Sequence, residues 1–387
     1  MSNLRKIFFF SLFLFIGTLL FWGVYNISFK NSDNEGESGI LKKKGESQIA
    51  ENVEKVKNVY DNKISLISDE AVLSPTLSQS GDRIRYFSPG EGSVFEIELD
   101  GTGKKKISDS GIKNPSKAIW SQDKSKIILK SLNGADNPSF YIFNVVAQKA
   151  EKIEKQIDEV SWQINADRIF YKYYNSATEE KILDVSDLNG GNWKEITKIP
   201  YRYVSLAQIP KTGLLSFWNS GKSDEKTIFE YVPIAGGEKK TIFSEKFGAD
   251  YLWSESGDYV LASYISSEEE GKLKLGVMSY TGEEFKNLDM PTFVSKCIWS
   301  KDDHAVFLAV PSGIEAGTKL PEDYKNGKIK TVDTFWKVDT ITGEKTRLVE
   351  VKDIKEEFDA QNLFLNSDES VLFFVNMKDQ KLYRINL

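Results

Sequence analysis

A unit of about 44 residues recurs along most of this chain, and this repeat constrains the fold more than any other feature. In each copy an apolar strand ends in Trp-Ser or a variant of it, a short turn with Asp, Gly or Ser follows, and a second apolar strand begins. The seven copies are anchored at Leu77, Trp120, Trp162, Gln208, Trp253, Trp299 and Leu365. The intervals between anchors are close to 44 residues except for the last, which is longer.

Each copy also contains a third and a fourth strand. The third ends in a glycine turn, as where 95–99 runs into Gly101, because glycine supplies the positive φ of a tight hairpin. A less apolar fourth strand follows, for example 104–108. Four strands per repeat are typical of a propeller blade, and blades bury both faces only by stacking around an axis. The sequence therefore predicts an all-β, seven-bladed β-propeller over residues 61–387.

The two ends of the repeat region predict how the ring closes. Residues 382–387 align with a third strand, so the last blade lacks its fourth, and residues 63–67 align with a fourth strand. We expect these segments to pair, because an open sheet edge would otherwise remain. The recurring tryptophans are best explained by packing between blades, a problem that repeats with the blade, rather than by an aromatic ligand site.

The motifs Trp-Ser-x-Asp, at 120–123 and 299–302, and Trp-Ser-x-Ser-Gly-Asp, at 253–258, resemble the TolB-like subset of WD40-like propellers. They are also similar to the N-terminal propeller of dipeptidyl-peptidase-IV-type enzymes. The resemblance covers about residues 60–387. It implies a propeller that serves as a periplasmic binding scaffold or as a gate to a separate catalytic domain. We expect no catalytic domain in this chain.

The N-terminus predicts a membrane anchor. Residues 7–29 carry no charge and, at about 1.5 Å per residue, are long enough to cross a bilayer. Arg5 and Lys6 precede them, which favours a cytoplasmic N-terminus at 1–6 and an extracytoplasmic propeller at the cell membrane. A cleaved signal peptide is the alternative, but the apolar run is longer than usual and no A-x-A-like site follows.

Residues 30–60 are expected to connect the anchor to the propeller. The first part, 31–46, is polar, charged and glycine-containing, as in a flexible linker. Ile49, Val53, Val56 and Tyr60 then recur with helical spacing, which indicates one short amphipathic helix.

No motif for catalysis or cofactor binding is found. The single histidine, His304, falls in a predicted turn, whereas triad chemistry usually needs an imidazole base. A zinc site usually draws on several Cys and His ligands, and the single cysteine, Cys297, lies on a predicted inner strand where burial is expected. The net charge is −6 with basic residues spread throughout, which argues against a nucleic-acid partner. We therefore expect no enzyme activity and no cofactor.

The loops between second and third strands are expected to be long, as at 175–180, and to share one side of the disc, which we call the loop face. The longest, 311–330, accounts for the long last interval. Long insertions on one face usually mark the binding face. The candidate interaction loop comprises Leu320, Pro321, Glu322, Asp323, Tyr324 and Lys325, with Pro321 suited to a helix start. The alternative is a packed loop without a partner.

Three functions remain open. The leading hypothesis is a membrane-anchored, extracytoplasmic scaffold that binds a protein or an envelope polymer through the loop face or channel mouth. The alternatives are a metal-dependent, lactonase-like propeller hydrolase that uses channel carboxylates, and a purely structural envelope component. Three or more Asp, Glu or Asn side chains converging at the channel would favour the hydrolase, and an apolar or aromatic loop-face patch would favour binding.

Overall fold

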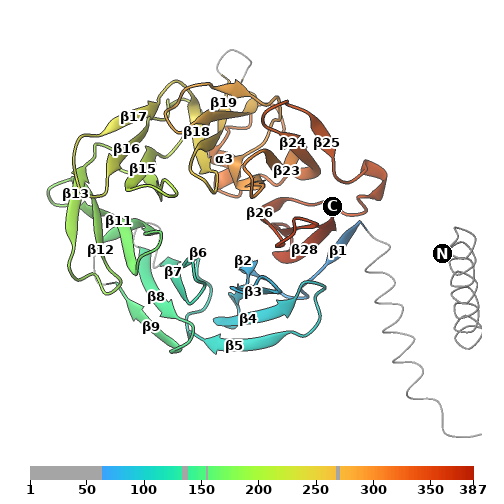
Figure 1. The fold of residues 1–387 in the computed structure, drawn as a ribbon, viewed down its shortest axis with the longest axis horizontal. Coiled ribbons are helices and arrows are strands. Elements are labelled where there is room, and N and C mark those ends of the chain that lie inside the picture. The colour runs from blue at the N-terminus through green and yellow to red at the C-terminus, as the bar shows by residue number, and fades with distance from the viewer. Residues whose placement is uncertain (1–62, 133–137, 154–155, 267–270) are drawn as a thin grey trace, which may run out of the picture. The chain divides into compact units, whose positions relative to one another are not determined.

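The structure, a computed structural model, describes residues 63–132, 138–153, 156–266 and 271–387. Seven four-stranded antiparallel sheets stand side by side around an axis, so the predicted seven-bladed propeller is confirmed (Figure 1). The predicted anchor at 7–29 and the predicted helix near 49–60 lie outside the described residues. Within the described residues, no helix is long and apolar enough to span a bilayer.

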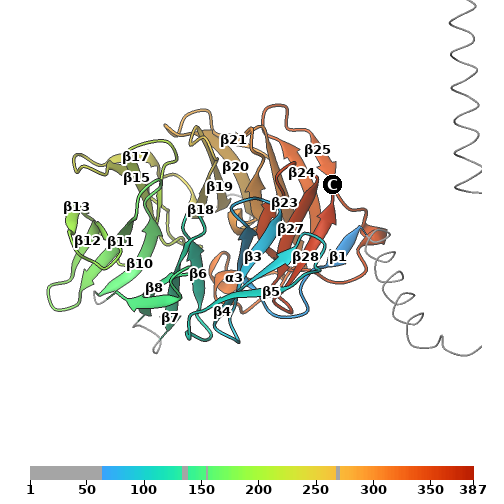
Figure 2. The same cartoon turned by 60° about the horizontal axis from the view of Figure 1, so that its bottom comes forward.

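In each of the first six blades the strands follow the chain from the innermost to the outermost, as Figures 1 and 2 show. Blade one contains β2 (Leu73–Leu77), β3 (Arg83–Ser88), β4 (Ser93–Glu98) and β5 (Lys105–Asp109). Blade two contains β6 (Lys117–Trp120), β7 (Lys126–Leu132), β8 (Pro138–Asn144) and β9 (Lys149–Lys152). Blade three contains β10 (Ile157–Trp162), β11 (Arg168–Asn175), β12 (Glu180–Asp187) and β13 (Lys194–Lys198). Blade four contains β14 (Val204–Gln208), β15 (Leu214–Asn219), β16 (Phe229–Pro233) and β17 (Lys240–Phe243).

The second half of the ring adds short helices between the strands. Blade five contains β18 (Phe247–Trp253), β19 (Tyr259–Ile265), β20 (Leu273–Ser279) and β21 (Lys286–Asn287). Blade six contains β22 (Cys297–Trp299), β23 (Ala305–Ser312), β24 (Val332–Asp339) and β25 (Lys345–Arg347). Blade seven contains β26 (Ala360–Leu365), β27 (Val371–Asn376), β28 (Lys381–Asn386) and β1 (Ile64–Leu66). The helices are η1 (Val294–Lys296), α3 (Glu322–Lys325) and η2 (Val351–Asp353).

The hydrophobic core is divided among the blade boundaries. One cluster of buried side chains lies between each pair of neighbouring blades, including the pair formed by blades seven and one. Between blades six and seven, for example, Phe307 and Phe335 pack with Phe374 and Tyr383. A ring arises because no single blade can bury both of its faces alone.

The N-terminal strand closes the ring as predicted. β1 pairs antiparallel with β28, with Ile64 opposite Ile385 and Leu66 opposite Tyr383. The N–H of Ile67 continues the pairing beyond the strand by donating to a carbonyl of β28 at 2.8 Å. The chain thus supplies the fourth strand of blade seven from residues that precede blade one.

The recurring tryptophans pack between blades, as predicted, and they also carry a hydrogen bond that the sequence did not reveal. Each indole N–H donates to the first or second strand of the preceding blade. The acceptors are the Ser74 carbonyl for Trp120 (2.7 Å), the Ile119 carbonyl for Trp162 (2.9 Å), the Ser216 hydroxyl for Trp253 (2.9 Å) and the Leu252 carbonyl for Trp299 (3.2 Å). In the fourth copy, Gln208 replaces tryptophan and its Oε1 accepts the N–H of Ile164 in blade three at 2.8 Å.

Cys297 and His304 lie where the sequence analysis predicted them, but one predicted long loop is only a short turn in the structure. Cys297 is buried on β22, and burial raises the pKa of its thiol. His304 is exposed in the turn before β23. The expected long loop at 175–180 is wrong: β11 and β12 pair up to Asn175 opposite Glu180, so only 176–179 connect them. Polar residues at the ends of these strands look like loop residues in the sequence, because sequence alone does not reveal cross-strand pairing.

Candidate functional site

The longest loop of the propeller lies between β23 and β24 and spans residues 313–331. It contains α3, which Figure 1 places on the inner side of the ring. Pro321 is the N-cap of α3, in line with the expected helix start. This loop, which we call loop six, therefore turns inward over the central region instead of projecting away from the blades.

Three of the six candidate residues, Leu320, Pro321 and Tyr324, are buried. Leu320 packs with Ile265, Leu273 and Phe293, all from blade five or the approach to blade six. The ring of Tyr324 stacks on Phe293, with centroids 4.4 Å apart and planes 6° from parallel. Both side chains are less than a tenth exposed. Most of the apolar surface of Leu320 and Tyr324 thus packs inside the propeller.

The charged candidate residues tie loop six to neighbouring groups. Glu322 accepts hydrogen bonds from the Ser223 backbone N–H at 2.8 Å and hydroxyl at 2.9 Å, which reaches blade four. Lys325 pairs with Asp250 of blade five at 3.0 Å. Asp323 pairs with Lys328 inside the loop at 2.8 Å, and this hydrogen bond lowers the pKa of Asp323. Glu322, Asp323 and Lys325 therefore hold the loop in one position.

The buried ammonium group of Lys296 lies at the centre of a hydrogen-bond network that holds loop six in place. Lys296 at the end of η1 is completely buried, and its Nζ lies 2.6 Å from Asp333 Oδ2 and 2.8 Å from Asp359 Oδ1. Its third hydrogen bond goes to the Ala360 carbonyl at 3.1 Å. The hydroxyl of Tyr324 donates to the same Asp359 oxygen at 2.7 Å. All three donors of the ammonium are used, and the network joins blade six, blade seven and α3.

The pKa values in this network reflect burial opposed by the lysine. Burial raises the pKa of Asp333 despite the attraction of Lys296. For Asp359, burial acts in the same direction, but the charge of Lys296 and hydrogen bonds from Lys296 and Tyr324 outweigh it and lower the pKa. Burial followed by the nearby Asp359 charge raises the pKa of Tyr324. A buried network in which every donor of the ammonium is satisfied makes its surroundings rigid.

The sequence analysis did not identify this network. Its members lie far apart along the chain and leave no local motif, because the ring brings blades six and seven together. One signal was present: Lys296 stands directly before Cys297 at the start of a predicted buried strand. A charged residue at such a position is rarely buried without a partner, so it indicated an acidic group elsewhere.

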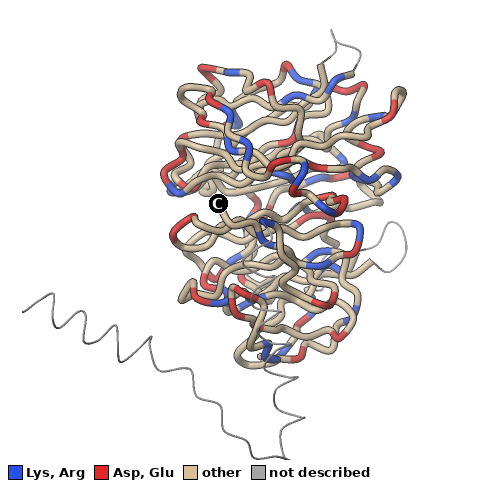
Figure 3. Tube along the Cα trace, turned by 90° about the vertical axis from the view of Figure 1, so that its right-hand side faces the viewer, with Lys and Arg blue, Asp and Glu red and all other residues tan. Residues whose placement is uncertain are grey.

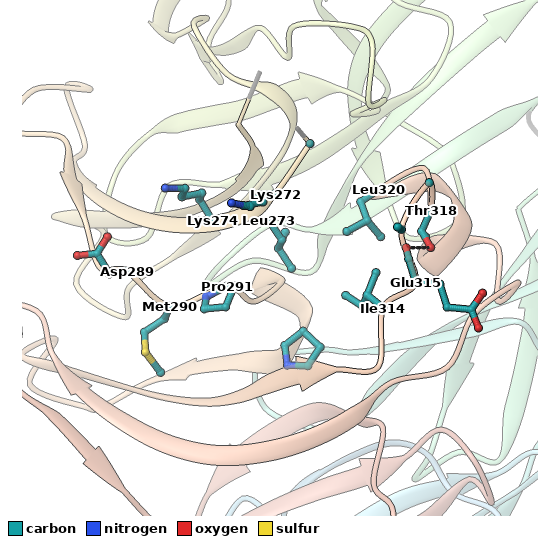
Figure 4. Close-up of a pocket in the computed structure, with 14 residues that line it drawn as sticks. Lys272, Leu273, Lys274, Asp289, Met290, Pro291, Ile314, Glu315, Thr318 and Leu320 are labelled. Carbon is teal, nitrogen blue, oxygen red and sulfur yellow. Dashed lines mark hydrogen bonds between the residues drawn. The ribbon is translucent and has the colours of Figure 1, made fainter. Parts of the chain in front are cut away.

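A groove of about 480 Å³ lies between loop six and the loop-face end of blade five. Figure 4 shows Leu273, Ile314 and Leu320 pointing toward one another across it. Met290 also lines it and is nearly buried. Glu315 points away from the groove in the same view. The groove therefore has an apolar floor, which is the kind of surface that favours binding.

The rim of this groove is charged. It carries Lys272, Lys274 and Asp289, so two cations and one anion surround the apolar floor on the blade-five side. Lys272 and Asp289 are exposed. An apolar floor with a few polar groups at its edge is typical of pockets that bind ligands or peptide side chains.

The carboxylates of the described residues do not gather into a metal site. Across the ranges that the structure describes, no group of three or more His, Cys, Asp or Glu side chains is placed to hold a metal ion. On innermost strands, Glu159 pairs with Lys117 at 2.9 Å and Asp250 pairs with Lys325. Basic and acidic residues are interspersed over the side of the propeller seen in Figure 3. A converging cluster of Asp and Glu, which would favour a hydrolase, is not found among the described residues.

No protein-family model and no curated protein sequence matches this chain. Among solved structures, it is similar to oligogalacturonate lyase from Vibrio parahaemolyticus, with a TM-score of 0.57, 10% identity and coverage of 84% of this chain and 93% of that chain. It is also similar to the β-propeller domain of the Trilobed protease from Pyrococcus furiosus, with a TM-score of 0.53, 12% identity and coverage of 81% and 95%.

A weaker likeness is to TolB from Acinetobacter baumannii, with a TM-score of 0.48, 12% identity and coverage of 79% and 70%. At these identities the first two likenesses support the propeller fold alone, and the third adds no argument. The Pyrococcus domain is described as having an open velcro topology. In the present chain, by contrast, β1 supplies the last strand of blade seven.

Proposed function

We propose that this chain is a membrane-anchored, extracytoplasmic binding scaffold that holds a segment of a partner protein in the groove between loop six and blade five. The observation that carries the proposal is the apolar floor of Leu273, Ile314 and Leu320 beneath a charged rim. A volume of about 480 Å³ falls within the range of pockets that enclose ligand groups.

The rigidity of the groove supports the same proposal. Leu320, which contributes to the floor of the groove, belongs to the loop that Tyr324 and the Lys296 network fix in place. A preformed site loses less conformational entropy on binding than a mobile loop, so less of the interaction energy is spent on ordering. Because loop six is already packed against blades four to seven, a partner is expected to dock without rearranging it.

Photocrosslinking in membranes tests the binding proposal. A photoreactive amino acid at Ala316, which is exposed in the groove lining, should form a discrete adduct with one partner. The additional change Ile314→Asp should reduce that adduct at least fivefold, because it places a charge on the apolar floor. The same photoreactive residue at Val146, exposed in a turn of blade two, is the control and should form none.

Equal adducts at Ala316 and Val146 would contradict the proposal that the groove binds the partner. An Ala316 adduct that is insensitive to Ile314→Asp would contradict it as well. The partner is then identified from the adduct by mass spectrometry. A polysaccharide adduct instead of a protein would favour an envelope polymer, which the scaffold hypothesis also allowed from the sequence, and would overturn the protein partner.

The anchor and orientation form a separate part of the proposal and are tested separately. The full chain should stay in the membrane fraction after carbonate washing, and a chain that lacks residues 7–29 should not. A reporter that is active only outside the cytoplasm, fused after Leu387, should be active in the full chain. Reporter activity restricted to the cytoplasm would overturn the extracytoplasmic location without affecting the groove.

A further inference from the structure

The outer edge of blade five is only partly covered. β21 has two residues, Lys286–Asn287, and is the shortest of the outer strands in the part of the chain that the structure describes. It pairs with β20 at Gly276 and Val277 alone. One further hydrogen bond, from the Leu288 N–H to the Leu275 carbonyl at 2.9 Å, extends the pairing before the chain leaves. The loop-face end of β20 therefore lacks an outer neighbour.

At this open end, the N–H and C=O of Leu273 point away from β19, toward the uncovered side of the strand. In an antiparallel sheet, alternate residues direct their N–H and C=O to opposite sides of the strand. The Lys272 carbonyl accepts the Ser266 N–H, so Lys272 faces β19, and the Leu275 carbonyl faces the β21 side. Leu273 shares the orientation of Leu275. Within the described ranges, the N–H and C=O of Leu273 have no hydrogen-bond partner.

This open edge borders the groove. Leu273 contributes to the apolar floor, while its neighbours Lys272 and Lys274 belong to the rim. Because side chains alternate across a strand, the two lysines lie on one face of blade five and Leu273 on the other. A strand added beside β20 would meet leucine on one face and lysines on the other.

We propose that the groove binds an extended peptide segment that adds to the outer edge of β20 as a short strand. The N–H and C=O of Leu273 would pair with the peptide backbone, which is the usual source of affinity in strand addition. The cross-strand neighbours then specify the peptide: apolar side chains on the Leu273 face and acidic side chains near the exposed Lys272 on the other. The segment is thus an alternating apolar and acidic one. This inference rests on the groove being the binding site.

A synthetic peptide tests the binding mode. The probe is a labelled ten-residue peptide that alternates valine and glutamate, added to the full chain in detergent and followed by fluorescence anisotropy. Methylation of backbone nitrogens on residues that face β20 should weaken binding at least tenfold, and methylation on the intervening residues should change it less than twofold. Amide hydrogen exchange at Leu273 should slow at least tenfold at saturating peptide.

The protein variants test the charge pattern. Lys272→Glu should weaken peptide binding about fivefold because it places like charges opposite one another. Lys105→Glu, at an exposed lysine on the outer strand of blade one, is the matched control and should have no effect. Equal effects of the two variants would overturn the acidic preference.

Each result separates the two proposals. Peptide binding with unchanged exchange at Leu273, or with no difference between the two methylation series, would overturn strand addition while the Ala316 crosslink could still support the groove. Failure of the alternating peptide to bind at millimolar concentration would also overturn strand addition. Absence of a specific adduct at Ala316 would instead contradict the proposal that the groove is the binding site.

Discussion

Replacement of Lys296 by methionine should destabilise the propeller by about 3–5 kcal/mol. The side chain is completely buried and its ammonium donates to Asp333, Asp359 and the Ala360 carbonyl. Methionine fills a similar volume but leaves two buried carboxylates without their cation. Removing one partner of a buried ion pair typically costs about this much, because the remaining charge is neither solvated nor paired.

The cost should depend on pH in a defined direction. Without Lys296, burial is no longer opposed, and the pKa of each carboxyl group should lie above its value in the unfolded chain. A carboxyl group whose pKa is higher in the folded than in the unfolded protein does not reduce the stability at a pH below the unfolded pKa, near 4. As the pH rises from there toward the folded pKa, the loss of stability increases. The destabilisation should therefore be smaller at pH 5 than at pH 8.

Urea denaturation of the full chain in detergent, followed by tryptophan fluorescence, measures this effect. Lys105→Met is the control and should change the free energy of unfolding by less than about 0.5 kcal/mol, as expected for an exposed residue. The triple variant Lys296→Met, Asp333→Asn and Asp359→Asn should recover much of the loss, because no buried charge remains and the amide oxygens can still accept the hydrogen bonds of Tyr324 and Ala360.

A cost below about 1 kcal/mol that is the same at pH 5 and pH 8 would refute this reasoning. It would mean that the three groups are hydrated in the folded protein. A triple variant less stable than the single one would instead show that the ion group contributes net stability, contrary to the expected compensation between desolvation and attraction.

Three further predictions concern the ring itself. Trp162→Phe keeps an aromatic ring but loses the indole hydrogen bond, so urea denaturation should show a loss of about 1 kcal/mol, and no loss would discount that bond. Hydrogen bonds from Ser121, and then from Ser125, lower the pKa of Asp123 to about 2, so its contribution is present above pH 4 and is lost as pH falls toward 2. The difference in thermal midpoint between Asp123→Ala and the original chain should disappear over that range, and a difference constant with pH would contradict it. Lys63 and Ile67 both form backbone hydrogen bonds with β28, so by alternation the N–H of Ser65 faces β28 and that of Leu66 faces outward. Ser65→Pro should therefore lower the thermal midpoint by several degrees and Leu66→Pro by less, and the reverse order would contradict the pairing.

Most of the fold could be predicted because its signals are local and repeated. The anchor residues from Leu77 to Leu365 give the number of blades, and the unmatched strands at the two ends give the closure. These features follow from strand periodicity and turn residues, which are written in consecutive positions. Strand ends were predicted less well, as at Asn175 and Glu180, because they depend on the partner strand.

The candidate site could be located only in part. The extra residues of loop six were visible in the long interval before Leu365, and Pro321 does lie at a helix start. The directions of the side chains were not visible. Leu320 and Tyr324 point into the propeller because Phe293 and Asp359 meet them there, and both partners come from separate stretches of the chain.

The amino-acid sequence alone thus determined the architecture. A strand pattern that repeats at a fixed length produces similar sheets, and stacking them in a closed ring buries both faces of every sheet. Only the tertiary structure decided which groups are buried and which are accessible on the loop face. Whether Lys296 finds two carboxylates, or whether the edge of β20 is left open beside Leu273, depends on contacts between residues distant along the chain. Such contacts exist only after the blades have closed, so a local pattern does not identify the partners.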